Sequence, residues 1–325
     1  MYLSIQKLSA PVREELELFH QEFTSAFQSD VDMINEISHY ILKQRSKRIR
    51  PLLVLLSAKL CGEPTRSTII SAGLVEMLHT ATLIHDDIID ESQVRRGVPS
   101  VNAVWQNKIS VLMGDFLFSR SLTNMLRIRN FEALDLLSKT SEALSSGEIL
   151  QLAKSSNNGM DEESYFRMIW LKTASLFASS CKVGALTVEA DPEQAEALYG
   201  YGKFLGMAFQ IKDDLFDYTA EEHSIGKPIG RDLKSNLITL PLLHVLNKMP
   251  RDKSREVREL IKSGLPAEDI QKINELIVND GGVRYTENKL EEISNKARAA
   301  LDIFPDSNAK QSLLGFVKFN LSRTS

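Results

Sequence analysis

The chain has 325 residues, of which 43% are hydrophobic and 25% charged, and a formal net charge of −4. This is the composition of a globular protein with a large core, and it excludes fibrous and disordered classes. The slight acidic excess and the absence of a long basic run exclude a nucleic-acid-binding surface. No uninterrupted apolar stretch approaches the roughly 18 residues of a membrane span, and no signal-peptide pattern begins the chain, so we expect a soluble protein, with the cytoplasm as its default compartment.

Hydrophobic spacing predicts an all-α fold. Apolar residues recur at intervals of three and four, as at Leu52, Leu55, Leu56 and Leu60, and alternating strand patterns are absent. The segment 191–194, Asp-Pro-Glu-Gln, has the N-cap, first-turn proline and capping-box glutamine of a helix start. Other helix boundaries are expected near Gly62-Glu63-Pro64, Asn157-Asn158-Gly159, Pro250, Gly264-Leu265-Pro266, Gly281-Gly282 and Pro305.

None of these breaks is long enough for a linker, so we expect one helical domain over residues 1–325. The longest non-periodic stretch, from Thr219 to Leu233, is rich in charge and glycine. A flap over a site is the prediction there. Cys61 and Cys181 lie in apolar helical surroundings and are expected to be thiols.

Two copies of one acidic pattern, Asp-Asp-x-x-Asp, lie in apolar helical stretches. The aspartates are Asp86, Asp87 and Asp90 in the first copy and Asp213, Asp214 and Asp217 in the second. On a helix the first and last carboxylates of a copy lie about 40° apart and the middle one about 60° from the last, so all three share a face. Such a cluster repels itself unless cations neutralise it, and oxygen ligands favour Mg²⁺ bridged to phosphate. The alternative for a single copy is a solvated acidic helix face.

Basic residues flank the first acidic motif. His79 precedes Asp86 by seven residues, about 20° from its direction on a helix. Arg95-Arg96-Gly97 follows the motif, and Lys47-Arg48-Ile49-Arg50 lies upstream. These clusters could hold a second anion. Taken singly, they could equally be a solvated turn, a core histidine and surface charges near a helix C-terminus.

The order of several motifs carries a family resemblance. They are Lys47-Arg48-x-Arg50-Pro51, His79, the first acidic motif with Arg95-Arg96-Gly97, Lys172-Thr173, Gly206-x-x-Phe209-Gln210 with the second acidic motif, Gly226-Lys227-Pro228, and Asp232-Leu233 with Thr239-Leu240-Pro241. This set covers nearly the whole chain and resembles the trans-type polyprenyl diphosphate synthases. The resemblance implies an all-helical barrel, usually a homodimer, with the acidic motifs facing each other across a central cavity.

The resemblance also implies residue roles. Asp86, Asp90 and Asp213 bind three Mg²⁺ with the allylic diphosphate, and Asp87, Asp214 and Asp217 support them. Arg95, Lys172 and Lys227 also hold the allylic diphosphate. Lys47, Arg50, His79 and Arg96 match positions that hold isopentenyl diphosphate. Lys172, Thr173 and Gln210 match catalytic positions, with the oxygens of Thr173 and Gln210 facing the developing cation.

The implied reaction is condensation of isopentenyl diphosphate onto an allylic diphosphate, with the departing diphosphate as the base. The alternatives are a terpene cyclase, against which the second set of basic residues argues, and a non-catalytic partner subunit, against which the six aspartates argue. We expect the two diphosphates as binding partners. We expect neither nucleic-acid binding nor a transmembrane segment. Transient membrane contact during product release is left open.

An apolar stripe precedes the first acidic motif. Leu74, Leu78 and Ala81 lie on one side of the predicted helix, and Thr82 follows. Core packing is the simpler interpretation of the stripe. By resemblance, however, short-chain synthases carry bulky aromatics at the positions of Ala81 and Thr82, so we expect a product longer than geranylgeranyl diphosphate, such as the octaprenyl side chain of a quinone. A geranylgeranyl synthase is the alternative. Bulk from Phe116 or Phe118 would stop the growing chain.

Overall fold

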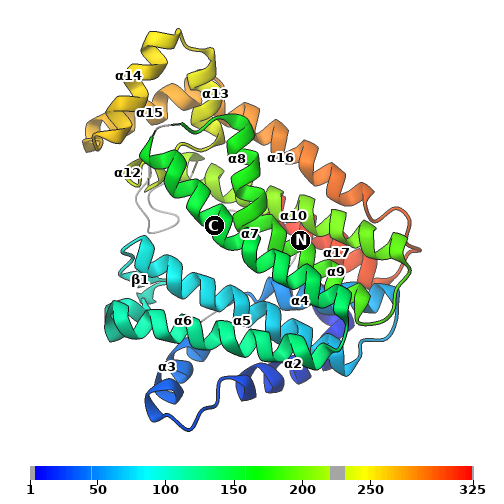
Figure 1. Cartoon of the computed structure of the whole chain (residues 1–325). Helices are drawn as coiled ribbons and strands as arrows, with labels where there is room; N and C mark the ends of the chain where they lie inside the picture. The colour runs from blue at the N-terminus through cyan, green and yellow to red at the C-terminus, as the bar shows by residue number, and fades with distance from the viewer. Residues whose placement is uncertain (1–3, 45, 158, 220–230, 324–325) are drawn as a thin grey trace. The chain divides into compact units, whose positions relative to one another are not determined.

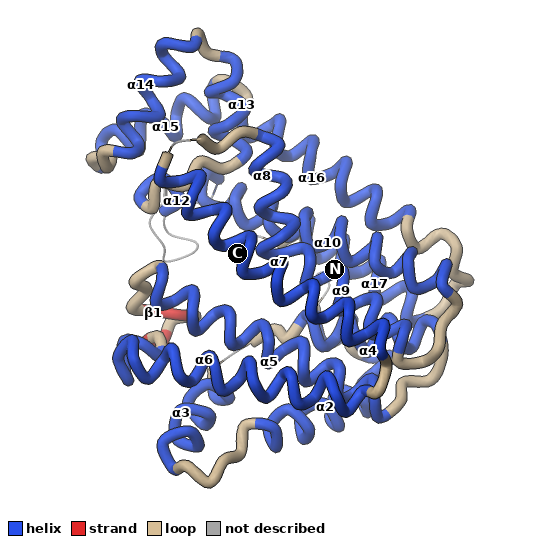
Figure 2. Tube along the Cα trace, viewed as in Figure 1, coloured by secondary structure: helices blue, strands red, loops and turns tan. Residues whose placement is uncertain are grey.

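The computed structural model describes residues 4–44, 46–157, 159–219 and 231–323. These residues are almost entirely helical, which confirms the all-α prediction (Figure 2). The chain forms two compact units. The first comprises Met1–Ser141, Leu176–Gly202 and Leu301–Gly315, and the second comprises Glu142–Ser175, Lys203–Ala300 and Phe316–Ser325. The expectation of one domain over the chain stays a prediction.

The first unit contains the N-terminal helices. They are α1 (Ile5–Leu8), η1 (Ala10–Val12), α2 (Arg13–Ala26), α3 (Asp32–Lys43), α4 (Ile49–Cys61), α5 (Arg66–Ile89) and α6 (Val101–Ile128), with the start of α7 (Phe131–Ser156), most of α9 (Ser175–Leu186), the start of α10 (Pro192–Thr219) and the start of α17 (Asn308–Ser322). Helix α5 packs against α2, α4 and α6, and its long contact with α6 is visible in Figure 1.

Helix α5 is the central helix of this unit. Thr65 caps its N-terminus and forms a reciprocal capping box with Thr68. By length and composition α5 could cross a membrane, but 72% of its most apolar window is buried inside the protein, as in a core helix. At Gly114 the neighbouring α6 approaches so closely that a Cβ atom there would stand 2.2 Å from Nε2 of His85. The end of α5 that carries the first aspartate motif is therefore held in place by packing.

A short hairpin follows α5. Strands β1 (Val94–Arg95) and β2 (Val98–Pro99) pair antiparallel, and the turn residues Arg96 and Gly97 have positive φ angles of 53° and 81°. Two consecutive left-handed residues are typical of the tight turns that join antiparallel strands. The sequence showed no strand here because two residues per strand are too few for an alternating pattern. This hairpin lies in an otherwise helical chain and leaves the all-α class unchanged.

The second unit contains the rest of α7, α10 and α17. Its other elements are α8 (Glu162–Ile169), the π-helix η2 (Trp170–Ala174), α12 (Arg231–Lys234), α13 (Leu240–Lys248), α14 (Arg251–Lys262), α15 (Ala267–Asn279) and α16 (Gly282–Ala299). Its core contains the fully buried Tyr165, Ile211, Leu242 and Ile277. Because Ile211 precedes the second aspartate motif on α10, this motif starts from a buried helix face.

The predicted helix boundaries are confirmed. Helix α10 begins at Pro192, and α4 ends before Gly62. Boundaries near Pro250, Gly264, Gly281 and Pro305 also separate helices in the structure. Most of the flap predicted from Thr219 to Leu233 lies outside the described residues.

Candidate active site

The three aspartates of the first motif have different surroundings. Asp86 is half-buried and Asp90 is exposed, whereas Asp87 is 3% exposed. Arg95 donates to Oδ1 of Asp87 from Nε at 2.8 Å and from Nη2 at 2.5 Å. A buried carboxylate bound by a guanidinium is a structural ion pair. The outer two carboxylates therefore form the accessible part of the motif.

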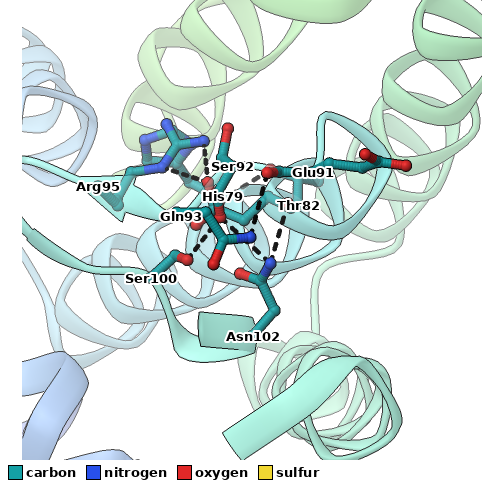
Figure 3. Close-up of polar contacts among 9 residues, drawn as sticks. His79, Thr82, Glu91, Ser92, Gln93, Arg95, Ser100 and Asn102 are labelled. Carbon is teal, nitrogen blue, oxygen red and sulfur yellow. Dashed lines mark hydrogen bonds and ion pairs between the residues drawn. The ribbon is translucent and has the colours of Figure 1, made fainter. Parts of the chain in front are cut away.

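Hydrogen bonds fix the loop that follows the first motif (Figure 3). The amide of Asn102 donates to the backbone carbonyls of Asp87 and Ser92 at 3.3 and 3.2 Å. The hydroxyl of Ser100 also donates to the Ser92 carbonyl, at 2.6 Å. Ser100 and Asn102, at the start of α6, thus hold the turn that leads from the first motif into the hairpin containing Arg95.

A small cavity beside the motif is lined by basic residues. Arg48, His79, Arg95 and Arg96 line it together with the acidic Glu76 and Asp87. All of these residues belong to the first unit. Arg50 donates from Nη1 to Nε2 of His79 at 2.9 Å, and its guanidinium lies over the ring of Phe177 at 4.7 Å. The structure thus gathers three of the four residues that resemblance assigned to isopentenyl diphosphate.

The fourth residue, Lys47, is exposed before α4 and does not line the cavity. Arg48, to which no role was assigned, does line it. Its guanidinium contacts Nδ1 of His20 and lies over the ring of Phe23 at 5.3 Å, so it is partly committed to α2. Arg48 also begins α4 in a left-handed conformation, with φ of 44°.

Burial and charge act on the titratable groups of this cavity. Burial raises the pKa of the Glu76 carboxyl, whereas Arg50, Arg48 and Arg96 lower it. Burial, followed by Arg50 and Arg96, lowers the pKa of His79 well below its usual range. His79 is therefore neutral at neutral pH. Because arginine only donates, Nε2 of His79 accepts from Arg50, and the ring proton lies on Nδ1.

The second motif repeats the arrangement of the first. Asp213 and Asp217 are half-buried, whereas Asp214 is 6% exposed. The Tyr165 hydroxyl donates to Oδ2 of Asp214 at 2.6 Å, and the Gln210 amide donates to Oδ1 at 2.9 Å. Burial raises the pKa of Asp214 to about 7, although both hydrogen bonds lower it. The middle aspartate is again held by the protein.

Arg323 contacts the second motif. Its Nη2 lies 2.5 Å from Oδ1 of Asp213, and its guanidinium lies 4.1 Å from the ring centre of Phe209 and 5.4 Å from that of Phe216. The Arg323 side chain is 7% exposed and that of Asp213 is 40% exposed. A guanidinium therefore sits on the carboxylate that, by resemblance, would bind a metal ion.

Lys172 and Thr173 lie in the π-helix η2. Such a single wide turn inserts an extra residue and is frequent at functional sites. Thr173 donates to Oε1 of Gln210 at 2.9 Å. Since Gln210 also donates to Asp214, hydrogen bonds connect the π-helix with the second aspartate motif. Lys172 pairs with Glu148 at 2.5 Å and donates to Gln151 at 3.1 Å.

The outer aspartates suit a hard divalent cation, because carboxylate oxygens are the ligands that Mg²⁺ and Ca²⁺ prefer. Within the described ranges no three Asp, Glu, His or Cys side chains converge to form a complete metal site. A metal held by one or two carboxylates and by substrate phosphates would fit these residues. Asp213 is paired with the positive charge of the Arg323 guanidinium. Lys227, expected at the allylic diphosphate, lies outside the described residues.

The residues expected to set chain length lie inside the first unit. Leu74, Leu78 and Ala81 are at most 2% exposed, and Thr82 is half-buried. The hydroxyl of Thr82 donates to the carbonyl of His79 at 2.8 Å, so it is satisfied within the helix.

Sequence reasoning did not identify several side chains of these clusters. They are Glu76, Glu148, Gln151, Tyr165 and Arg323. A glutamate within the apolar run before His79 was the available signal for Glu76. The other four belong to segments whose sequence gives no indication of their partners.

A family model described as polyprenyl synthetase matches residues 31–278. The chain belongs to the polyprenyl synthetase family. The chain is 33% identical over 321 residues to octaprenyl diphosphate synthase of Escherichia coli, covering 99% of both chains. It is 34% identical over 308 residues to heptaprenyl diphosphate synthase component 2 of Bacillus subtilis, covering 95% of this chain and 88% of that one.

Solved structures agree with this assignment. A decaprenyl diphosphate synthase from Rhodobacter capsulatus has a TM-score of 0.94 and 32% identity, covering 99% of this chain and 100% of that one. A polyprenyl synthase from Caulobacter crescentus, complexed with calcium and isoprenyl diphosphate, has a TM-score of 0.91 and 33% identity, covering 99% and 98%. This family member is a prenyltransferase of the long-chain trans-polyprenyl type, and its family uses a divalent metal.

We expect the neutral state of His79 to make the stability of the substrate-free protein depend on pH. Below about pH 6.5 the unfolded chain binds a proton that native His79 does not, so stability falls as pH falls. In His79→Gln this loss should be smaller, by about 1 kcal/mol at one pH unit below 6.5. Urea unfolding between pH 5.5 and 7.5 measures it. Exposed His39 provides the control, and an equal change in His39→Gln would contradict the assignment.

Proposed function

We propose that the chain extends an allylic diphosphate, farnesyl or geranylgeranyl, by successive addition of isopentenyl units to about octaprenyl length. The basic cavity beside the first aspartate motif carries this proposal. A terpene cyclase ionises one diphosphate and needs no second anion site. The cavity lined by Arg48, His79 and Arg96 supports one, since an arginine and the Nδ1–H of a neutral histidine are both donors suited to phosphate oxygens.

In this proposal the outer aspartates hold Mg²⁺ together with the allylic diphosphate. Asp86 and Asp90 contribute from α5, and Asp213 contributes from α10, with three ions per active site. The bound metal supplies Lewis acidity that draws charge onto the leaving diphosphate. Asp87 and Asp214 keep the outer carboxylates in place by their own hydrogen bonds, and Asp217 accepts from the backbone N–H of Asp232 at 3.0 Å.

The remaining groups bind or orient the reacting carbon chains. Lys172 binds the allylic diphosphate, as do Arg95 and Lys227. Because the Thr173 hydroxyl donates to Gln210, its oxygen lone pairs are free to face the developing allylic cation. Lys47, Arg50, His79 and Arg96 hold isopentenyl diphosphate while its double bond attacks. The released diphosphate takes the proton that is lost.

We further propose a cytoplasmic homodimer that contacts the membrane only during product release. The first unit has an exposed apolar face on α6 with residues at helical spacing. Its members are Val111, Leu112, Phe118, Leu122 and Leu126. A contiguous face of this kind is typical of a protein interface. The B. subtilis relative is named as one component of a synthase, so a different partner chain is the alternative occupant.

Incubation of the purified chain alone with Mg²⁺, farnesyl diphosphate and labelled isopentenyl diphosphate tests the function. We expect elongation by the chain without a partner. Asp86→Ala and Asp213→Ala should each lower the rate at least 100-fold. Each removes a carboxylate ligand of the metal ion whose charge stabilises the leaving diphosphate. Both variants should remain folded by circular dichroism.

The matched control is Asp135→Ala, which removes an exposed carboxylate paired with Lys139 on α7. Its rate should equal that of the wild type. Release of diphosphate without use of isopentenyl diphosphate would indicate a cyclase. A folded wild-type chain that is active only with another protein would indicate a partner subunit. More than a tenth of wild-type turnover in Asp213→Ala would contradict the metal assignment.

Arg323 should compete with metal for Asp213. We expect Arg323→Ala to bind Mn²⁺ several-fold more tightly in the absence of substrate, because the metal no longer displaces a buried guanidinium. Electron paramagnetic resonance of free Mn²⁺ measures the affinity. Arg298→Ala removes the same charge from a surface pair with Glu291 and should leave the affinity unchanged. Weaker binding by Arg323→Ala would show that the arginine assists the metal.

Ala81→Phe should shorten the product to farnesyl or geranylgeranyl diphosphate and leave the first condensation intact. The added ring lies five residues before Asp86, about 1.4 helical turns away, where the growing chain would pass. Phe116 is half-buried on α6 and is the better candidate for the natural stop, since Phe118 is 37% exposed. Chromatography of dephosphorylated products reads out the length. Ala81→Ser is the volume-matched control, and an unchanged product in Ala81→Phe would place the tunnel elsewhere.

A further inference from the structure

Helix α7 presents two acceptors to Lys172. Oε2 of Glu148 lies 2.5 Å from the Lys172 ammonium, and Oε1 of Gln151 lies 3.1 Å from it. The two acceptors are three residues apart and therefore share one face of the helix. Glu148 is 8% exposed, whereas the Lys172 side chain is 23% exposed and can be reached by a ligand.

Gly147 explains how α7 comes so close to the π-helix. A Cβ atom at this position would stand 2.5 Å from the backbone nitrogen of Lys172 and 2.9 Å from Cβ of Leu171. Any larger residue would push the two segments apart. Both acceptors thus stand on a regular helix that lies directly against the backbone of Lys172.

An ammonium group has three N–H bonds on a flexible stem, and it is otherwise an undirected point charge. Two acceptors at fixed positions leave one N–H, whose direction is then determined. We infer that Glu148 and Gln151 are positioning residues that aim this third N–H of Lys172 at the allylic diphosphate. The inference rests on the proposed function, which gives Lys172 that ligand.

Packing alone does not account for Glu148. Its second oxygen, Oε1, is buried and accepts no hydrogen bond from any residue that the structure describes. A buried carboxylate oxygen in this state destabilises the folded protein. An apolar residue would fill the same space at lower cost, so an acceptor at this position is better explained by what it does to Lys172.

A double-mutant cycle tests the inference. We expect Glu148→Ala to lower kcat/KM for farnesyl diphosphate about 10- to 100-fold, as misplacement of a binding group does. The KM for isopentenyl diphosphate should stay within about twofold, since that substrate binds other residues. In a Lys172→Ala background the same change should cost less than about twofold, because there is no ammonium left to aim.

Glu148→Gln keeps an acceptor oxygen and should retain activity within about threefold of the wild type. Glu142→Ala removes an exposed glutamate of the same helix and should have no effect. If Glu148→Ala does not fold, Gln151→Ala takes its place in the cycle. The inference would be overturned if the fold-losses of kcat/KM in Glu148→Ala and Lys172→Ala simply multiply in the double variant. A Glu148→Gln loss as large as that of Glu148→Ala would also overturn it, since charge and not acceptor direction would then matter.

Calorimetric binding of magnesium pyrophosphate repeats the cycle without turnover. Glu148→Ala should weaken pyrophosphate binding in the wild-type background and leave it unchanged in Lys172→Ala. Independent effects on binding overturn the inference whether or not the chain elongates. Failure of the proposed function would appear separately, as a wild-type chain that binds pyrophosphate but incorporates no isopentenyl unit.

Discussion

The buried middle carboxylate of each aspartate motif is the constraint on which the metal-binding groups depend. Arg95 holds Asp87, and Tyr165 with Gln210 holds Asp214. On a helix, fixing the rotation of the middle aspartate also fixes the directions of the outer two, which lie one position before it and three positions after it. The outer carboxylates share a face with the middle one but are less buried, so they remain accessible. The middle aspartate is held by hydrogen bonds in both units. The donor is a guanidinium in the first unit, and the donors are neutral groups in the second.

The neutral donors of the second motif have a further consequence. Because Gln210 donates to Asp214 through its amide nitrogen, its amide oxygen is oriented toward Thr173. The threonine hydroxyl must then donate, which leaves its lone pairs for electropositive carbon. A single hydrogen-bond chain therefore links the rotation of α10 with the polarity of the groups on the π-helix. Tyr165, which donates to Asp214, is one end of this chain, so changing it would loosen the orientation of Gln210 and Thr173 as well.

Local patterns were sufficient to predict the helices and the spacing of the aspartates, since both depend on residues within one turn. Pro192 marks the start of α10 because its fixed φ and missing N–H act locally. Arg323 could not be predicted, because its partner lies 110 residues away and its segment carries no motif. Glu148 could not be predicted either, because the sequence of α7 does not distinguish it from the other charged residues of that helix. Long-range pairing, not secondary structure, limited the prediction of the site.

Charge balance explains why the basic cavity of the first unit favours an anion. Glu76 is buried among guanidiniums, and its pKa is raised by burial and lowered by Arg50, Arg48 and Arg96. One carboxylate cannot neutralise three such cations, so the cavity keeps an excess of positive charge in a poorly solvated place. His79 adds one donor, its Nδ1–H, without adding to that excess, because its lowered pKa keeps it neutral. A doubly or triply charged diphosphate removes the excess in one step, which a singly charged carboxylate ligand would not.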